Sequence, residues 1–482
     1  MKVFCEPTST KNLIPSLGMC LPLRDAVPHA AGILLYGKCF MAEKTMDLDQ
    51  WLDKNNSVKK YAHFDRRVSI KTVWDEIRDP QNILTHAFLP FIHSPLIFHK
   101  YSKNKGRRDK TRQLYYSSHY DRCIYQYYSY LLNERYNIIA DKVGINQTSI
   151  AYRTNLHKSN IHFAKEAFDF IKEQQSCFII VGDFKDFFDS LNHSYLKVQL
   201  CSILGMDRLP EDYYKVYRSI TKYSYVDFSE ILKYYGMPDT ITSRRELNKK
   251  DIILPVQILR KMDIIKSNEK NYGIPQGSAI SAVLSNIYML EFDQKVNEFI
   301  KQYKGKYLRY SDDTIFILPV TAESEIQEIH LEIRKIISEI PNLTLQAEKT
   351  KLYYYNGGKL LNKDSLIDGR ANDKNIIDYL GFSFDGKNIY LRDKTISKYY
   401  YRMYKKADTV VKRKGISPKG NIISNKNLYK TYSLKGANGS EISKGNFLSY
   451  VKRCKSVFGP NEKVVKVLNT HYGKIKKRLK KI

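Results

Sequence analysis

Residues 306–318 read KYLRYSDDTIFIL, and this stretch decides the fold that the sequence predicts. Apolar and aromatic residues fill both ends of the stretch, as in two short strands, and the polar Ser311-Asp312-Asp313 falls between them at a turn. Two adjacent carboxylates at a tight turn repel each other, so the arrangement is costly unless a cation neutralises it. The stretch therefore predicts a β-hairpin that carries acidic side chains at its tip, beside a bound cation.

A third acidic residue ends another short apolar run. Residues 177–181 read CFIIV and lead directly into Gly182-Asp183. A brief apolar run followed by an acidic residue is typical of a central strand that delivers a carboxylate to a site. Oxygen-only ligands favour Mg²⁺, with Mn²⁺ as an alternative, and two such ions about 3.5–4 Å apart support phosphoryl transfer. Asp183, Asp312 and Asp313 are therefore candidate catalytic and metal-ligating residues.

The charge of the chain indicates a polyanionic partner. The 482 residues include 80 Lys and Arg against 50 Asp and Glu, a formal charge of +30. From Arg392 to the end there are 25 Lys and Arg and 4 Asp and Glu. Such a surplus costs self-repulsion in the folded state and is usual where a polyanion is bound, although ribosome-associated and membrane-surface proteins share it. The basic C-terminal segment is therefore a candidate nucleic-acid interface.

The tyrosines and cysteines further narrow the class of protein to which the sequence can belong. Many of the 38 tyrosines stand beside Lys or Arg, and aromatic rings stack on unpaired bases while cations hold phosphates. The seven cysteines are scattered and form no CxxC pair, so neither a zinc site nor a disulfide framework is expected. The sequence shows no apolar leader and no run of 18 apolar residues, which predicts a cytoplasmic protein without a membrane span.

Apolar periodicity predicts the main elements around these motifs. Helices are expected around residues 120–136, from Ser278 to about residue 290 with Ser278 as the N-cap, and over residues 323–340. Further strands are expected at residues 343–346 and 379–384, and residues 207–270 indicate helices and an insertion.

Five stretches, in this order, resemble the polymerase motifs of reverse transcriptases. Residues 183–191, DFKDFFDSL, look like motif A, and residues 273–278, GIPQGS, are similar to motif B. Residues 310–313, YSDD, match the YxDD of motif C. Leu343, Leu345 and Lys349 resemble motif D, and Tyr379-Leu-Gly-Phe382 resembles the primer-grip hairpin. The resemblance covers about residues 100–390 and is looser upstream, at residues 105–112 and 151–153.

This resemblance implies an α+β fold of the right-hand polymerase type, with fingers, a palm built on an antiparallel sheet, and a helical thumb. The expected boundaries are an N-terminal extension at residues 1–85 and fingers at residues 86–176. The palm would span residues 177–391, with a fingers insertion near residues 207–270. Residues 392–482 would form a basic helical thumb or C-terminal domain.

The resemblance also implies a role for each matching position. Asp183, Asp312 and Asp313 would form the site of two Mg²⁺ ions, with Asp313 acting as an electrostatic support. Phe188 matches the steric-gate position, where a ring crowds a 2′-hydroxyl and favours deoxynucleotides; the alternative is an ordinary core residue. The other nucleotide-binding and primer or template positions are Lys105, Arg112, Gln276, Gly277, Lys349, Tyr310, Tyr379 and Gly381.

Among reverse transcriptases, the sequence is similar to the bacterial branch that contains group II intron and retron enzymes. It lacks the Cys-rich segments usual in the former and the Val-Thr-Gly usual in the latter. Residues 119–128 and 151–155 look most like the defence-associated (unknown group and abortive-infection) enzymes. The resemblance implies cDNA synthesis in antiphage defence, with a structured non-coding RNA as template, dNTPs as substrates and DNA as product. It leaves a homo-oligomer open.

Three alternatives stay open at this point. The first is an RNA-dependent RNA polymerase, which an aromatic residue at position 188 disfavours. The second is an RNA-binding, maturase-like scaffold, which has no need for a repulsive pair of aspartates. The third is a generic basic RNA-binding protein, which explains the charge but not the order of the motifs.

Overall fold

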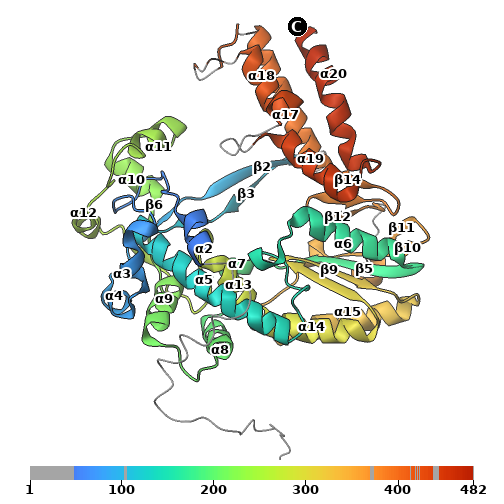
Figure 1. Cartoon of the computed structure of the whole chain (residues 1–482), viewed down its shortest axis with the longest axis horizontal. Helices are drawn as coiled ribbons and strands as arrows, with labels where there is room; N and C mark the ends of the chain where they lie inside the picture. Colours follow the sequence, from blue (N-terminus) through green and yellow to red (C-terminus); the bar gives the residue numbers. More distant parts are fainter. Residues whose placement is uncertain are drawn as a thin grey trace, which may run out of the picture. The chain divides into compact units, whose positions relative to one another are not determined.

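The computed structural model describes residues 48–102, 106–369, 374–412, 414–417, 420, 422, 424–437 and 445–480. The chain divides at Leu48, and the second compact unit, Asp49–Ile482, holds the fold described below. Helices and strands both contribute, and the described strands form four sheets (Figure 1). No helix in the described ranges is long and apolar enough to cross a membrane.

The largest sheet has five strands, all antiparallel, in the order β11 (Lys359–Asn362), β10 (Lys351–Asn356), β5 (Ser176–Asp183), β9 (Asp313–Leu318) and β8 (Lys306–Tyr310). Alternate residues of β5 face two different hydrophobic cores: Phe178 and Ile180 lie in one, and Cys177 and Ile179 in the other. A strand that is buried on both faces needs apolar residues at every position. This explains the uninterrupted apolar run and confirms the expected strand and hairpin.

Helices cover both faces of this sheet. Figure 1 shows α6 (Asn160–Glu173) on one side of β5 and β9, and α14 (Leu290–Gln302) and α15 (Glu323–Ser338) on the other. The first core also takes residues from α5 (His119–Lys142), α8 (His193–Leu204), α9 (Glu211–Thr221) and α13 (Ser281–Tyr288). The helices expected around residues 120–136 and 323–340 are confirmed as α5 and α15.

Two expectations about local structure are wrong in detail. Helix α13 begins at Ser281 and not at Ser278, because turns occupy residues 276–277 and 279–280. Within the described part of the chain, the buried Ser278 hydroxyl has no hydrogen-bond partner and so caps no helix. The Ser281 hydroxyl, in contrast, donates to the Pro275 carbonyl oxygen over 2.8 Å. The strand expected at residues 343–346 is reduced to one bridge between Leu345 and Phe184.

The C-terminal part joins a small sheet to a group of helices. Strands β12 (Ile377–Tyr379), β13 (Phe382–Phe384) and β14 (Ile389–Leu391) form an antiparallel sheet that shares the second core with α6. Beyond it, α17 (Asp393–Lys412) contacts α18 (Asn425–Tyr432) and α20 (Lys466–Lys480), and α19 (Phe447–Phe458) contacts α6. Two 3₁₀ turns, η4 (Leu434–Gly436) and η5 (Lys463–Val465), connect these helices.

A four-stranded sheet contains both parallel and antiparallel pairs. Its strand order is β4 (Tyr115–Tyr116), β1 (Phe91–His93), β6 (Ser224–Asp227) and β7 (Lys266–Ser267). Residues 207–270 are therefore more than an inserted loop, because they supply two strands of this sheet. Three short helices between those strands surround a third core with Ile92: α10 (Phe228–Tyr234), α11 (Ile241–Leu247) and α12 (Val256–Lys261). A separate hairpin pairs β2 (Leu96–Ser102) with β3 (Gly106–Arg112).

Shorter elements complete the described residues. They are α2 (Leu48–Asn55), η1 (Lys71–Val73), α3 (Trp74–Arg78), α4 (Pro80–Thr85), η2 (Thr154–Leu156), α7 (Phe187–Ser190), η3 (Ala347–Lys349) and α16 (Ser365–Asp368).

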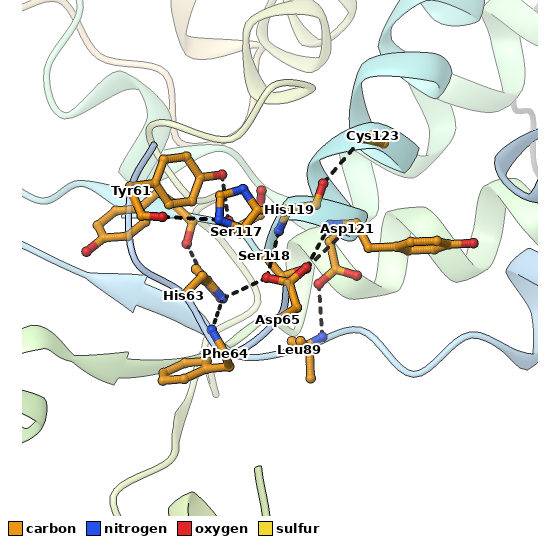
Figure 2. Close-up of polar contacts among 12 residues, drawn as sticks. Tyr61, His63, Phe64, Asp65, Leu89, Ser117, Ser118, His119, Asp121 and Cys123 are labelled. Carbon is orange, nitrogen blue, oxygen red and sulfur yellow. Dashed lines mark hydrogen bonds and ion pairs between the residues drawn. The ribbon is translucent and has the colours of Figure 1, made fainter. Parts of the chain in front are cut away.

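A cluster of polar residues fixes the first turn of α5 (Figure 2). The Asp65 carboxylate accepts hydrogen bonds from the backbone N–H groups of His119 and Tyr120, at 3.0 and 2.9 Å. The buried Asp121 carboxylate accepts from the Leu89 N–H over 2.9 Å. It also pairs with His86 Nε2 over 2.6 Å. Acidic groups at a helix N-terminus satisfy free N–H groups and favour the helix dipole. The cluster therefore joins residues 61–65 and 86–89 to α5.

Candidate active site

The fold brings the three aspartates to one edge of the largest sheet. Asp183 is the last residue of β5, and Asp313 is the first residue of β9 and its direct partner in the antiparallel register. Asp312 lies in the turn before β9, and its carbonyl oxygen accepts from the Phe184 N–H over 3.0 Å. Ser311, in the same turn, has a left-handed backbone with φ of 61°. The acidic turn and the acidic strand end therefore form one cluster, as the sequence predicts.

Burial and mutual repulsion make this cluster electrostatically costly. Burial, followed by the charges of Asp312 and Asp183, raises the pKa of Asp313 to about 6. Burial raises the pKa of Asp312 as well, and the charge of Asp183 adds to that rise. The cations that oppose these shifts are Lys349 for both groups, Arg392 for Asp313 and Arg112 for Asp312.

Lys349 bonds directly to one aspartate of the acidic cluster. It follows the bridge of Leu345 to Phe184, and its Nζ donates to Asp183 Oδ1 over 2.7 Å. Both side chains keep solvent access, with 41% of Lys349 and 22% of Asp183 exposed. The ammonium group therefore lies at the open side of the acidic cluster.

The carboxylate oxygens of the three aspartates are ligands that a divalent cation accepts. No three His, Cys, Asp or Glu side chains in the described part of the chain are arranged as a ready metal cage. Mg²⁺ seldom uses such a cage, since one or two carboxylates with water and substrate phosphates complete its shell. Burial and then the neighbouring carboxylates raise the pKa values of Asp312 and Asp313, and the nearby cations only partly offset this. The residues present therefore fit Mg²⁺ or Mn²⁺.

A buried ion pair holds the acidic turn through a hydrogen bond to its backbone. Arg309 Nη2 lies 2.6 Å from Asp293 Oδ2, and neither side chain is exposed to solvent. Arg309 Nη1 also donates to the Ser311 carbonyl oxygen over 3.0 Å. The backbone of Arg309 accepts from the Ile150 N–H and donates to the Thr148 carbonyl oxygen. The turn is therefore held both by its own strands and by the segment at residues 148–150.

The loop at residues 273–278 bonds to the segment that follows Asp183 and contains two glycines with positive φ, Gly273 and Gly277. The Ile274 N–H donates to the Phe188 carbonyl oxygen over 2.9 Å. Gly277 has φ of 115°, and a Cβ there would lie 2.7 Å from the Tyr115 carbonyl oxygen. The Gln276 carbonyl oxygen accepts from the Tyr115 N–H over 2.9 Å. Only a residue without a side chain fits this close backbone approach.

Phe187 and Phe188 have different environments although they are adjacent. Phe187 belongs to the first core and is 4% exposed, whereas Phe188 is half-buried at the start of α7. The two rings meet edge to face with centroids 5.5 Å apart. Phe188 therefore retains an accessible surface beside the loop at residues 273–278, which its proposed contact with a nucleotide requires.

Of the other predicted site residues, the structure describes Arg112 and Tyr310. Lys105 lies outside the described residues. Arg112 is exposed at the end of β3, with its guanidinium 5.8 Å from the Phe98 ring centroid. Tyr310 is half-buried, and its ring lies 6.4 Å from that of Tyr152, whose hydroxyl donates to Ser311 Oγ.

The predicted primer-grip hairpin has one buried and one accessible position. Tyr379 is only 1% exposed, so its ring is a core residue that cannot itself touch a primer. Leu380 and Gly381 form the turn, with φ of 46° and 92°, and a Cβ on Gly381 would meet open space. Any contact with nucleic acid would therefore use the turn and not the Tyr379 ring.

The sequence indicated no role for four residues that lie in this region: Arg309, Asp293, Arg392 and Tyr152. A signal existed for Arg309, because a charged residue inside an apolar strand needs a buried partner. Its partner Asp293 was not identifiable, since it lies on α14 and only the tertiary fold brings the two together.

One family model matches the part of the chain that holds Asp312 and Asp313, but its match does not include Asp183. Residues 239–384 match the family model "Reverse transcriptase (RNA-dependent DNA polymerase)". Protein YkfC of Escherichia coli (strain K12) is 28% identical over 128 residues, which is 20% of this chain and 33% of that protein. The chain thus spans about a third of the length of this curated relative.

Solved structures of telomerase are also similar to the chain. Telomerase from Candida albicans, in complex with the TWJ fragment of telomeric RNA, matches at 13% identity and a TM-score of 0.36. The match covers 89% of this chain and 72% of that one. Apo telomerase from Candida tropicalis matches at 13% identity and a TM-score of 0.39, over 89% of this chain and 74% of that one.

The family match thus indicates a reverse transcriptase domain at residues 239–384; such domains belong to RNA-directed DNA polymerases, which are nucleotidyltransferases.

Proposed function

We propose that this protein is an RNA-directed DNA polymerase whose reaction is centred on Asp183, Asp312 and Asp313. One observation carries the proposal: the register of β5 and β9 pairs Asp183 with Asp313 beside a domain matched to reverse transcriptases. Three carboxylates at one edge, two of them with raised pKa values, favour cation binding over a purely structural role.

The residues of the site suit nucleotidyl transfer. Asp183 and Asp312 would hold Mg²⁺, with Asp313 as an electrostatic support. When bound, the divalent ions supply Lewis acidity to the primer hydroxyl and the phosphates. Lys349 holds a proton at Nζ beside Asp183, where it would neutralise charge on the departing pyrophosphate. Arg112, whose charge already acts on Asp312, would bind the triphosphate, since a guanidinium offers two parallel donors to phosphate oxygens.

The loop at residues 273–278 and Phe188 would select the nucleotide. Gly277 lets the loop pack against the Tyr115 backbone, and this contact would hold Gln276 and Gly277 in position beside the nucleotide. The half-buried Phe188 ring would occupy the space that a 2′-hydroxyl needs. The enzyme would therefore prefer dNTPs to rNTPs.

The finer organisation belongs to the same proposal. Residues 86–176 would be the fingers and residues 177–391 the palm, with residues 1–85 as an N-terminal extension. The pairing of β6 with β1 supports assigning the insertion near residues 207–270 to the fingers. Residues 392–482 would be the thumb, since their described regular elements are helical apart from one isolated bridge and carry a large positive surplus.

Biologically, we propose a cytoplasmic enzyme that makes cDNA from a dedicated structured RNA in antiphage defence. The support is the resemblance of residues 119–128 and 151–155 to defence-associated enzymes, together with the positive charge of the C-terminal segment. Sequencing the RNA and DNA that co-purify with the protein tests this. One abundant RNA with DNA complementary to it is expected, and a random mixture of cellular RNA fragments would contradict it.

Primer extension tests the polymerase itself. The purified chain would be given oligo(dT) annealed to poly(rA) or to poly(dA), with dTTP or UTP, in MgCl₂ or EDTA. We expect extension of the RNA template with dTTP, and none in EDTA. A preference for UTP would identify an RNA polymerase instead. RNA binding without incorporation of either nucleotide would identify a scaffold.

A further inference from the structure

A cavity among the C-terminal helices combines positive charge with aromatic side chains. It has a volume of about 740 Å³ and lies between α17, α18 and the start of α19, which are labelled in Figure 1. This volume is in the range of sites that take a small molecule or a single extruded group, about 300–1,000 Å³. The basic side chains that line it are Lys394, Lys398, Arg402 and Lys430.

Among the described residues, nothing that lines this cavity offsets its positive charge. All four basic side chains are exposed, and within the described ranges no carboxylate lines the cavity and none of the four forms an ion pair. Lys394, Lys398 and Arg402 stand at successive four-residue steps of α17, about 6 Å apart along its axis. A row of unpaired cations on one helix face suits the phosphates of a nucleic acid.

In a second cavity, by contrast, lysines pair with carboxylates of the protein itself. The cavity of about 400 Å³ beside α6 is lined by lysines as well, but each meets a carboxylate. Lys158 and Lys306 pair with Glu166, and Lys165 pairs with Asp169. The lysines in that cavity neutralise the protein's own acids, whereas those beside α17 are available for an external anion.

Aromatic rings form the floor of the α17 cavity. The Tyr399 ring centroid lies 4.7 Å from that of Phe447 and 5.7 Å from that of Tyr432. The Tyr399 hydroxyl donates to the Tyr432 carbonyl oxygen over 2.7 Å, so the two buried tyrosines are fixed. Phe447 is half-buried at the first turn of α19 and keeps an accessible surface. The floor therefore offers an apolar ring beside the cations.

We propose that this cavity binds one unpaired nucleotide of a single-stranded RNA. The base would lie against Phe447, and the flanking phosphates would contact Lys398, Arg402 and Lys430. A duplex keeps its bases stacked and presents only its backbone, so it would use the cations without the aromatic floor. The choice of RNA rests on the proposed function. The cavity would give the enzyme a grip on its template that is separate from the active site.

Fluorescence anisotropy with the full-length protein tests the proposal. The probes are a labelled 20-nucleotide single-stranded RNA and the same RNA in a duplex, at one fixed salt concentration. Arg402→Glu should weaken binding of the single strand about tenfold or more, and Phe447→Leu about tenfold, since each removes one of the two contacts. Lys405→Glu is the matched control, because it makes the same charge change on α17 outside the cavity.

The outcomes separate this proposal from its rivals. Equal losses in Arg402→Glu and Lys405→Glu would mean general electrostatics, and an equal loss for the duplex would mean a duplex track; either overturns it. An unchanged affinity in a folded Phe447→Leu variant also overturns it. Ultraviolet crosslinking of 4-thiouridine RNA to Phe447 or Tyr432 gives an independent check. Binding is measured without nucleotide incorporation, so a failure of the polymerase assay leaves this result readable.

Discussion

Arg309 and Asp293 form an ion pair that is completely buried, with Nη2 and Oδ2 2.6 Å apart, directly behind the acidic turn. Arg309 bonds at the same time to the Ser311 carbonyl oxygen, and Tyr307 donates its hydroxyl to Asp293. A buried pair of this kind stabilises little compared with apolar residues, yet removing one partner leaves an uncompensated charge. The pair therefore fixes the position of the turn more than it adds to overall stability.

Asp293→Asn should accordingly destabilise the protein by about 3–5 kcal/mol and slow nucleotide incorporation by displacing the turn. Thermal unfolding gives the first value, and a lower kcat at unchanged KM would show the second. The exposed pair of Lys335 and Glu332 is the control, since Glu332→Gln should cost less than about 1 kcal/mol. Equal effects of Asp293→Asn and Glu332→Gln would contradict a positioning role.

Gly277→Ala should abolish most of the incorporation of dNTPs. Its Cβ would lie 2.7 Å from the Tyr115 carbonyl oxygen, so the loop at residues 273–278 would have to move. Gly205→Ala provides a match, because Gly205 also has a positive φ, of 67°, but open space around its Cβ. It should cost about 1–2 kcal/mol of backbone strain and leave the rate within a few-fold. Single-turnover incorporation distinguishes them, and similar losses in both would show that close approach is not the reason.

Phe188→Ala should relax sugar selection, raising the ratio of rNTP to dTTP incorporation by about tenfold or more as the clash with the 2′-hydroxyl is lost. Phe187→Ala is the control, because this neighbouring ring is 4% exposed in the core. It should destabilise the protein by about 3–5 kcal/mol without changing the sugar preference. Competition between dTTP and UTP on one template measures the ratio. An unchanged ratio in Phe188→Ala would make Phe188 an ordinary core residue.

The cluster in Figure 2 predicts a loss of stability in acid. His63 is completely buried, its Nδ1 accepts from the Phe64 N–H, and burial lowers its pKa to about 3 from an ordinary 6.5. Between these values the unfolded chain binds a proton that the folded chain does not, so the free energy of unfolding falls as the pH falls. From pH 6.5 to 5 this residue alone should cost about 1.6 kcal/mol. Urea unfolding across this range should show a shallower pH dependence in His63→Gln, and an identical slope would refute the assignment.

The sequence alone was enough to predict the elements that depend on local residue patterns. The apolar run before Asp183 could only be a strand buried on both sides, and the YSDD stretch could only be a hairpin. The acidic cluster also needs the two strands to be neighbours, because the end of one strand lies beside the start of its antiparallel partner. Motif order supplied the rest of the prediction for residues 100–390.

The sequence was insufficient wherever distant segments decide the structure. The pairing of Lys349 with Asp183 joins residues 166 positions apart. Ser278 carries the chemistry of an N-cap, but the turns that bring Gly277 against Tyr115 delay the helix by three residues. Tyr379 had the pattern of a functional hairpin, and only tertiary packing shows that its ring is buried.

The most direct test is the extension of a DNA primer on an RNA template by the wild-type chain and by Asp183→Asn and Asp312→Asn variants. Asp186→Asn is the control, because Asp186 is exposed close to Asp183 in the sequence, and its left-handed φ of 45° suits asparagine. Wild type and Asp186→Asn should extend the primer with dNTPs, and each site variant should be slower by at least about 100-fold. Full activity in Asp183→Asn or Asp312→Asn would contradict a polymerase centred on these aspartates.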